Sequence, residues 1–254
     1  MEEIKKHKSE IKWNSVLGVF SAIFIFFAAQ LLAAIWMYVF ALIRFGDDKQ
    51  ASAWISDSTL GQFFSLSLSS FIVIGLVLWF LWWKNSKPSV IGLVKPKISH
   101  FFYGIVTAPV YFVFLVIVLA IAGAIFPSLN LDQKQEIGFD NVSGSLELFL
   151  IFIGLAIIVP IAEEILFRGL LYTSFKKAMP IFWAALATSL IFAAGHLPEG
   201  GDAGPLYVAG IDTFLLSFFL IFLREKTGSL WSSIALHATK NSIAFLFVFV
   251  LKIQ

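Results

Sequence analysis

The sequence predicts an all-α protein, a polytopic transmembrane helical bundle of about seven spans. Of its 254 residues 59% are hydrophobic and 13% are charged, and the mean hydropathy is +0.89. An ordinary soluble domain has about a quarter of its residues charged. Such an excess of apolar side chains cannot be buried in one water-soluble core, so membrane lipid is the expected partner of the outer surface.

The apolar residues also occur in runs of the right length, because a helix needs about 20 mostly apolar residues to cross a bilayer. Seven runs lie between polar breaks, at about 16–43, 60–83, 101–126, 146–172, 181–196, 205–223 and 230–251. The first is far longer than the apolar part of a secretory signal, so we expect it to remain as a membrane anchor. We divide the single membrane domain into 1–145, with three spans, and a core at 146–254, with four.

Lysine and arginine predict the orientation. They concentrate in alternate connections, at Lys5, Lys6, Lys8, Lys12, Lys84, Lys87, Lys95, Lys97, Lys176, Lys177, Arg224 and Lys226. The opposite connections hold only Arg44, Lys49 and Lys134, with Lys252 at the end. Because cytoplasmic loops carry the excess of positive charge, we expect a cytoplasmic amino terminus and an external carboxyl terminus. The basic residues form no single clustered face, so no nucleic-acid partner is expected.

Three of the apolar runs contain polar residues that are costly in a membrane. The fourth reads VPIAEEILFRG, the fifth ends in IFAAGH, and the seventh contains HATKN. Charged groups in membrane helices usually face the bundle interior or a water-filled cavity and mark a functional site. The candidate site residues are Glu163, His196, His237 and Asn241. Glu164, Arg168 and Phe192, which lies one turn below His196, are expected to give structural support.

Helix periodicity separates the two adjacent glutamates. Residues four apart share a face, so Glu164 is the natural partner of Arg168. Neighbouring residues differ by about 100° around the helix, so Glu163 is expected to point elsewhere and to stay available for chemistry. On the same spacing rule, His237 and Asn241 project from one face of the seventh span.

Depth along the helices indicates that the polar groups converge. The midpoint between Glu163 and His196 falls at 179–180, where the turn of an antiparallel hairpin is expected. Counted at about 1.5 Å per residue, Glu163 lies about 13 Å from Tyr172, and His237 lies about 12 Å from the start of its span. We therefore expect a site below the cytoplasmic face, with the polar stretch HLPEGGDAGP forming part of a cavity wall.

The motifs EEILFRG, FAAGH and HATKN, in that order and with LREKTGSLW ahead of the third, resemble those of the CPBP family. This family contains CAAX proteases, bacteriocin-processing (Abi) enzymes and Rce1-like prenyl-protein peptidases, and the resemblance covers about 146–251. It implies an intramembrane endopeptidase in which Glu163 and His196 activate a water and His237 and Asn241 hold the oxyanion. We expect a peptide or lipidated peptide as substrate and the plasma membrane of a bacterium as location.

The candidate residues are compatible with a zinc-dependent mechanism and with a metal-free one. Two histidines and a carboxylate form a usual catalytic zinc set, so a metalloprotease would use Glu163, His196 and His237 as ligands. In that case the base role would fall to Glu164, which is already assigned to Arg168. We therefore favour a metal-free glutamate mechanism with no cofactor, and keep zinc as the alternative.

Other classes of function also fit some of these residues. Buried carboxylates mark ion pathways in proton-coupled transporters, although the sequence has no inverted halves. A non-catalytic bacteriocin-immunity protein would keep the same fold, with the polar groups serving as hydrogen bonds between helices. Lys240 is expected to extend to water without catalysing, and His7 and His100 to be solvated. The sequence leaves the oligomeric state open.

Overall fold

The computed structural model describes residues 11–131, 133, 137–142, 144–198 and 204–252, and over these residues the secondary structure is helical, without strands. The main helices are α2 (Ser15–Phe45), α4 (Thr59–Trp83), α5 (Ile98–Ile125), α9 (Ile181–His196), α10 (Tyr207–Thr227) and α11 (Leu230–Phe245), together with a continuous helix from Ser145 to Ala178. Six helices are long and apolar enough to cross a membrane, and α9 is a shorter apolar helix. The predicted class and the seven apolar segments are confirmed.

A polar helix that the apolar runs did not predict, α3 (Asp48–Asp57), follows α2. Gly46 ends α2 in the left-handed conformation, and the side chain of Asp47 accepts a hydrogen bond from the backbone N–H of Gln50 to begin α3. Local capping therefore specifies this helix. A short 3₁₀ turn, η1 (Pro88–Ile91), lies in the connection after α4.

The continuous helix from Ser145 to Ala178, called the long helix below, is not uniform. It consists of α6 (Ser145–Phe152), η2 (Ile153–Ile158), α7 (Val159–Glu163), η3 (Glu164–Leu171) and α8 (Tyr172–Ala178), and η2 and η3 are π-helical. Short π-helical turns inside α-helices are rare and frequently occur at functional sites. The fourth span was predicted to end at Tyr172, but the long helix continues to Ala178. Glu163 therefore lies farther from the end of its helix than the sequence predicted.

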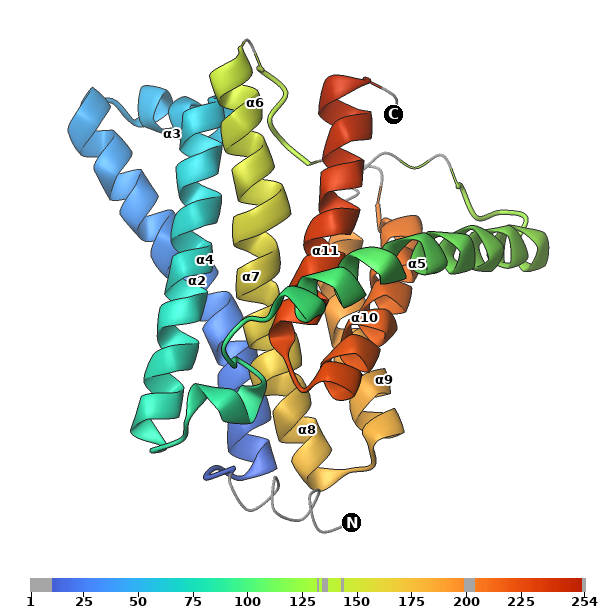
Figure 1. The fold of residues 1–254 in the computed structure, drawn as a ribbon. Helices are drawn as coiled ribbons and strands as arrows, with labels where there is room; N and C mark the ends of the chain where they lie inside the picture. Colours follow the sequence, from blue (N-terminus) through green and yellow to red (C-terminus); the bar gives the residue numbers. More distant parts are fainter. Residues whose placement is uncertain (1–10, 132, 134–136, 143, 199–203, 253–254) are drawn as a thin grey trace.

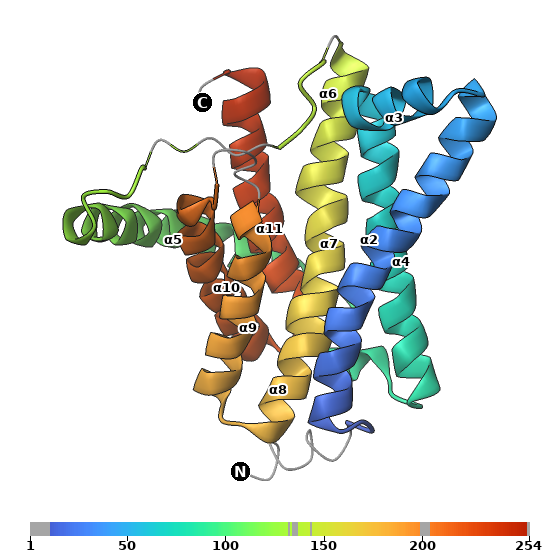
Figure 2. The same ribbon diagram turned by 180° about the vertical axis from the view of Figure 1, so that it is seen from behind.

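The helices form two groups around the long helix. In Figures 1 and 2, α2 and α4 lie on one side of it, and α9, α10 and α11 lie on the other. Helix α5 crosses α11 steeply, and its second half projects beyond the bundle (Figure 1). A Cβ atom at Gly104 would lie 2.6 Å from the carbonyl oxygen of Ser232 and 2.7 Å from the backbone nitrogen of Leu236. Only glycine therefore permits this close crossing of α5 over α11.

The bundle has two ends, which we call the lysine-rich end and the opposite end. The lysine-rich end contains the start of α2, the segment from Lys84 to Lys97, and the turns that join α8 to α9 and α10 to α11. The opposite end contains α3, the start of the long helix and the last turns of the helix that continues from α11, whereas the shorter α9 ends at about the middle of the bundle (Figure 1). Of the predicted charges, Lys5, Lys6, Lys8 and Lys134 lie outside the described residues, as does His7.

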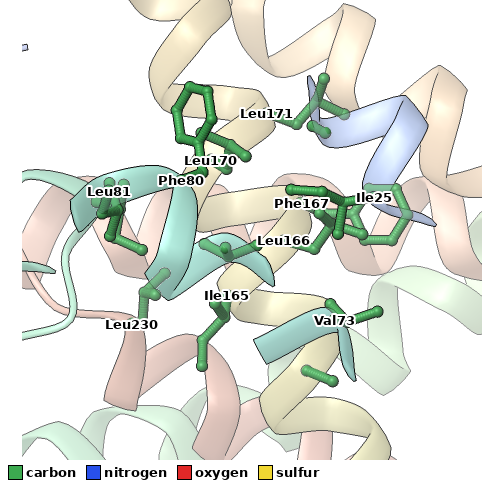
Figure 3. Close-up of a cluster of buried hydrophobic side chains, with 14 of the residues drawn as sticks. Ile25, Val73, Phe80, Leu81, Ile165, Leu166, Phe167, Leu170, Leu171 and Leu230 are labelled. Carbon is green, nitrogen blue, oxygen red and sulfur yellow. The ribbon is translucent and has the colours of Figure 1, made fainter. Parts of the chain in front are cut away.

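The largest hydrophobic cluster fills the half of the bundle near the lysine-rich end. Figure 3 shows part of it, where α4, the long helix and the start of α11 meet. Phe80, Leu81, Leu170, Leu171 and Leu230 are each at most 2% exposed. This cluster separates the centre of the bundle from the lysine-rich end.

His100 corrects one expectation. It was predicted to be solvated, but its side chain is buried, with 6% of the residue exposed. Its Nδ1 accepts a hydrogen bond from the backbone N–H of Lys97 at 3.2 Å and lies 3.2 Å from the hydroxyl of Ser229. His100 therefore caps the start of α5 and joins it to the turn before α11, a role set by tertiary contact.

Candidate active site

A cavity of about 430 Å³ lies inside the bundle, and it contains the predicted catalytic side chains. Glu163 from the long helix, His196 from α9, and His237 and Asn241 from α11 all line it. The four residues thus come from three helices to one space. Helices α2, α4 and α10, together with Ile137 and Phe249, complete the walls.

The imidazole of His237 lies between the two adjacent glutamates. Its Nδ1 is 2.9 Å from Oε1 of Glu164, and its Nε2 is 3.6 Å from Oε2 of Glu163. Because an ionised carboxylate can only accept hydrogen bonds, Nδ1 carries the proton donated to Glu164. Helix periodicity predicted that the glutamates point in different directions, and one ring nevertheless reaches both, because its two nitrogens face opposite sides.

Glu164 and Arg168 form the predicted pair. Arg168 Nη1 donates to Glu164 Oε1 at 2.9 Å, and both side chains are fully buried. The same oxygen also accepts the hydrogen bond from His237. Arg168 and His237 therefore hold Glu164 in place, and Glu164 in turn orients the His237 ring. The side chain of Glu163, in contrast, is 24% exposed and lines the cavity. No sequence pattern predicts the contact of Glu164 with His237, because it joins residues far apart in the chain.

Phe192 connects the buried arginine with His196. The guanidinium carbon of Arg168 lies 4.1 Å from the centre of the Phe192 ring, a cation–π contact. The His196 ring packs edge-to-face on the same ring, with centroids 4.7 Å apart. Phe192 itself is 1% exposed. The three residues predicted as structural support, Glu164, Arg168 and Phe192, thus form one continuous contact network behind the cavity.

His196 is the last residue of α9. Its Nδ1 lies 2.8 Å from the carbonyl oxygen of Phe192, one turn earlier. A carbonyl oxygen can only accept, so Nδ1 carries a proton, and Nε2 is the nitrogen that can act as acceptor or base. The polar stretch 196–205 was predicted to form part of the cavity wall. Of its described residues, 196–198 and 204–205, only His196 lines the cavity, and residues 199–203 lie outside the described part of the chain.

Asn241 is anchored to an irregular point of the long helix. Its Nδ2 donates to the carbonyl oxygen of Leu155 at 2.9 Å. The N–H of Val159 bonds to Gly154, and Pro160 has no N–H, so this carbonyl is available to a side chain. One amide hydrogen of Asn241 is used in this contact. The second hydrogen and the amide oxygen are the groups that can serve a ligand in the cavity.

The cavity also contains a pair of charged side chains that no sequence motif indicated. Lys240 was expected to extend to water; instead its Nζ lies 3.0 Å from Oδ2 of Asp212 on α10, and both residues line the cavity. The hydroxyl of Tyr111 on α5 donates to the other oxygen of Asp212. Gln30, near the middle of α2, also lines the cavity. A single polar residue inside a long apolar run is the signal that would have identified Asp212 and Gln30.

A catalytic zinc site needs three protein ligands around an open position. In the described part of the chain, no group of three His, Cys, Asp or Glu side chains is arranged to hold a metal ion. Glu163 and His237 are close, but the other nitrogen of His237 is directed to Glu164. The donor set in this arrangement does not fit a three-ligand zinc site.

Comparison with known proteins supports a peptidase. Residues 145–243 match the family model described as type II CAAX prenyl endopeptidase Rce1-like. The matched segment begins with the long helix and ends in α11 just beyond Asn241. It includes the four predicted catalytic residues, Glu163, His196, His237 and Asn241. The match confirms the resemblance to the CPBP and CAAX proteases. No curated protein and no solved structure gave a match to the chain.

Proposed function

We propose that this chain, an integral membrane protein whose residues 145–243 match the Rce1-like endopeptidases, hydrolyses a peptide bond inside its cavity without a metal. The observation that carries the proposal is the convergence of Glu163, His196, His237 and Asn241 from three helices on one cavity. The family match supports the coarser statement that the protein is a protease. The roles below are part of the proposal.

Glu163 is proposed as the general base. Peptide hydrolysis requires an activated water, a proton carrier for the leaving amine, and donors for the oxyanion. Glu164 is fully buried and held by Arg168 and His237, so Glu163 is the carboxylate that can reach a water in the cavity. It takes a proton from the water and delivers that proton to the leaving amine. The basic Nε2 of His196 accepts a hydrogen bond that orients the same water.

His237 and Asn241 are proposed as the oxyanion donors. Asn241 supplies its second amide hydrogen without a charge. His237 supplies Nε2–H when the ring is doubly protonated, with Glu164 holding Nδ1–H on the other side. Glu164 and Arg168 act only by positioning this ring. Such donors are effective because they are already in place when charge develops on the substrate oxygen.

A membrane-embedded peptide or lipidated peptide is the proposed substrate class, because the cavity lies within a bundle of apolar helices. A prenylated tail, a bacteriocin leader and a pheromone precursor all meet this description. The sequence predicted cleavage near the cytoplasmic face. Most of the lining residues lie in the half of the bundle nearer the opposite end, so this proposal names no side for cleavage.

Purified protein in detergent, assayed with a fluorogenic peptide, tests the proposal. Glu163→Gln, His196→Ala and His237→Ala should each reduce kcat/KM by orders of magnitude, and combining them should add little, because residues that act as a unit are strongly non-additive. Asn241→Ala should cost roughly 10²–10³-fold, the usual loss for one oxyanion donor. Glu147→Gln, on the same helix but away from the cavity lining, is the control and should keep full activity.

The same preparation distinguishes the mechanisms. Activity that survives exhaustive chelation, in protein without stoichiometric zinc by elemental analysis, supports the metal-free mechanism. Loss on chelation with rescue by zinc would replace it with the zinc alternative and keep the peptidase. Full activity of Glu163→Gln would contradict both the metal-free and the zinc-dependent mechanism. Transport or bacteriocin immunity would then be the better supported function.

A further inference from the structure

The cavity is not centred between the two ends of the bundle. Helix α11 runs from the lysine-rich end to the opposite end and lines the cavity from His237 onward, as far as Phe249 just beyond it. Helix α10 runs the other way and contributes Ala209 to Leu216, its first half. Helix α9, which starts at the lysine-rich end, contributes only its last residue, His196.

Helix α4 shows the same displacement, whereas the lining residues of α2 and the long helix lie near the middle of those helices. The lining residues of α4 end at Val73, well before Trp83 at the lysine-rich end. Ile137, in the connection that precedes the long helix, also lines the cavity. Within the described part of the chain, the connections at the lysine-rich end contribute no lining residue. The cavity therefore extends from Glu163 toward the opposite end.

The hydrophobic cluster closes the other direction. Phe80, Leu81, Leu170 and Leu171 belong to the cluster shown in Figure 3, and each is at most 2% exposed. Along α4 and the long helix they come after the last lining residues, Val73 and Phe167, toward the lysine-rich end. The start of the chain adds to this closure, because Trp13 donates to the hydroxyl of Ser174 at 2.9 Å. Close-packed apolar side chains leave no path for water or for a peptide.

We propose that the cavity admits its ligand from the opposite end of the bundle and not from the lysine-rich end. This inference rests on the proposed function, since it names the side from which a substrate enters the proposed active site. The positive-inside pattern makes the lysine-rich end cytoplasmic. The substrate class is then a peptide segment presented at the external face, such as one that has already been exported or that emerges from the membrane there.

The polar residues along this path suit an extended peptide. Asp212, Lys240, Gln30 and Ser65 all line the cavity. Peptide N–H and C=O groups entering a membrane need hydrogen-bond partners, because an unsatisfied group in hydrocarbon costs several kcal/mol. A wall with carboxylate, ammonium, amide and hydroxyl groups supplies both donors and acceptors for the backbone.

Single cysteines provide a test that needs no catalysis, since the chain contains no cysteine of its own. Ala209→Cys and Ala244→Cys place a thiol in the cavity wall. Ser52→Cys on α3 marks the opposite end, and Lys87→Cys marks the lysine-rich end; both residues are exposed. The full-length variants are treated with a charged, membrane-impermeant methanethiosulfonate, in intact cells and in inside-out vesicles, and the modified fraction is measured by mass.

The cavity thiols are expected to react in the preparation in which Ser52→Cys reacts, and to lose that labelling where only Lys87→Cys reacts. Labelling that follows Lys87→Cys would overturn the inference. Labelling in neither preparation, with both markers reactive, would overturn it as well, because the cavity would then be closed to water from the opposite end.

An activity measurement separates this inference from the proposed function. A membrane-impermeant peptide should be hydrolysed by wild-type protein in sealed vesicles only from the side on which Ser52→Cys is labelled. Cleavage from the Lys87→Cys side contradicts the inference while the peptidase stands. If the cavity thiols are labelled as expected but no peptide is cleaved in detergent or in vesicles, the proposed peptidase activity is contradicted. The position of the cavity opening is then still supported.

Discussion

His237 joins a fully buried ion pair to the cavity. Its Nδ1 is held by Glu164, which Arg168 holds in turn, and its Nε2 faces Glu163. A histidine whose second nitrogen is bound by a carboxylate has a defined tautomer and ring orientation. The consequence at the residue scale is that Glu164 and Arg168 affect chemistry through the position of one ring.

The buried pair gives the first prediction. Glu164→Ala or Arg168→Ala leaves one charge buried without its partner, which costs about 3–5 kcal/mol. Each single variant should therefore lower the midpoint of thermal unfolding in detergent and the yield of folded protein. The double variant should recover part of the loss. Wild-type stability in both single variants would show that the pair contributes nothing to folding.

The pair of Lys240 and Asp212 should behave differently. Their side chains are 19% and 17% exposed to the cavity, so water can solvate either group when the other is removed. Lys240→Met should cost about 1 kcal/mol or less, as for solvent-accessible ion pairs. The midpoint of thermal unfolding, measured beside Arg168→Ala, checks this order. A loss as large as that of Arg168→Ala would indicate that the cavity is dry around Lys240.

At the scale of elements, the crossing of α5 over α11 depends on one glycine. A Cβ atom at Gly104 would lie 2.5 Å from the Cβ atom of Ala235 and 2.6 Å from the carbonyl oxygen of Ser232, which is backbone and cannot turn away. Gly104→Ala should therefore destabilise the protein by about 1–3 kcal/mol, the usual cost of overpacking. Thermal unfolding in detergent measures it.

Gly75 offers the matched control, because a Cβ atom there would have no neighbouring atom within 4 Å. Gly75→Ala in α4 should keep or raise stability, since alanine is the better helix former. Equal stability of the two alanine variants would mean that α5 can move away from α11 at no cost.

The orientation in the membrane is a prediction for the whole molecule. The lysine-rich end contains Lys84, Lys87, Lys95, Lys97, Lys176, Lys177 and Lys226, so it should lie in the cytoplasm. Reporter fusions should place the amino terminus inside and the carboxyl terminus outside. Both ends on the same side would mean that one apolar helix does not cross, and α9 and the steeply inclined α5 are the elements to examine first.

Much of this architecture follows from sequence alone. The apolar runs predicted the spans to within a few residues in most cases, because the bilayer imposes a fixed length and internal hydrogen bonding on any helix that crosses it. The spacing of Glu164 and Arg168 predicted their ion pair, because a helix brings residues four apart together without any tertiary contact. The family resemblance rested on short motifs and was confirmed by the match over 145–243.

The tertiary structure alone decided what these segments build together. That His237 reaches both glutamates, that Asp212 holds Lys240, and that His100 is buried all depend on contacts between helices far apart in the chain. The depth of Glu163 was counted from Tyr172, but the long helix ends at Ala178, so the site lies deeper than predicted. The direction in which the cavity extends also follows only from the packed helices. Local rules determine which residues share a helix face, but the packing of helices determines which faces meet and toward which end the space between them extends.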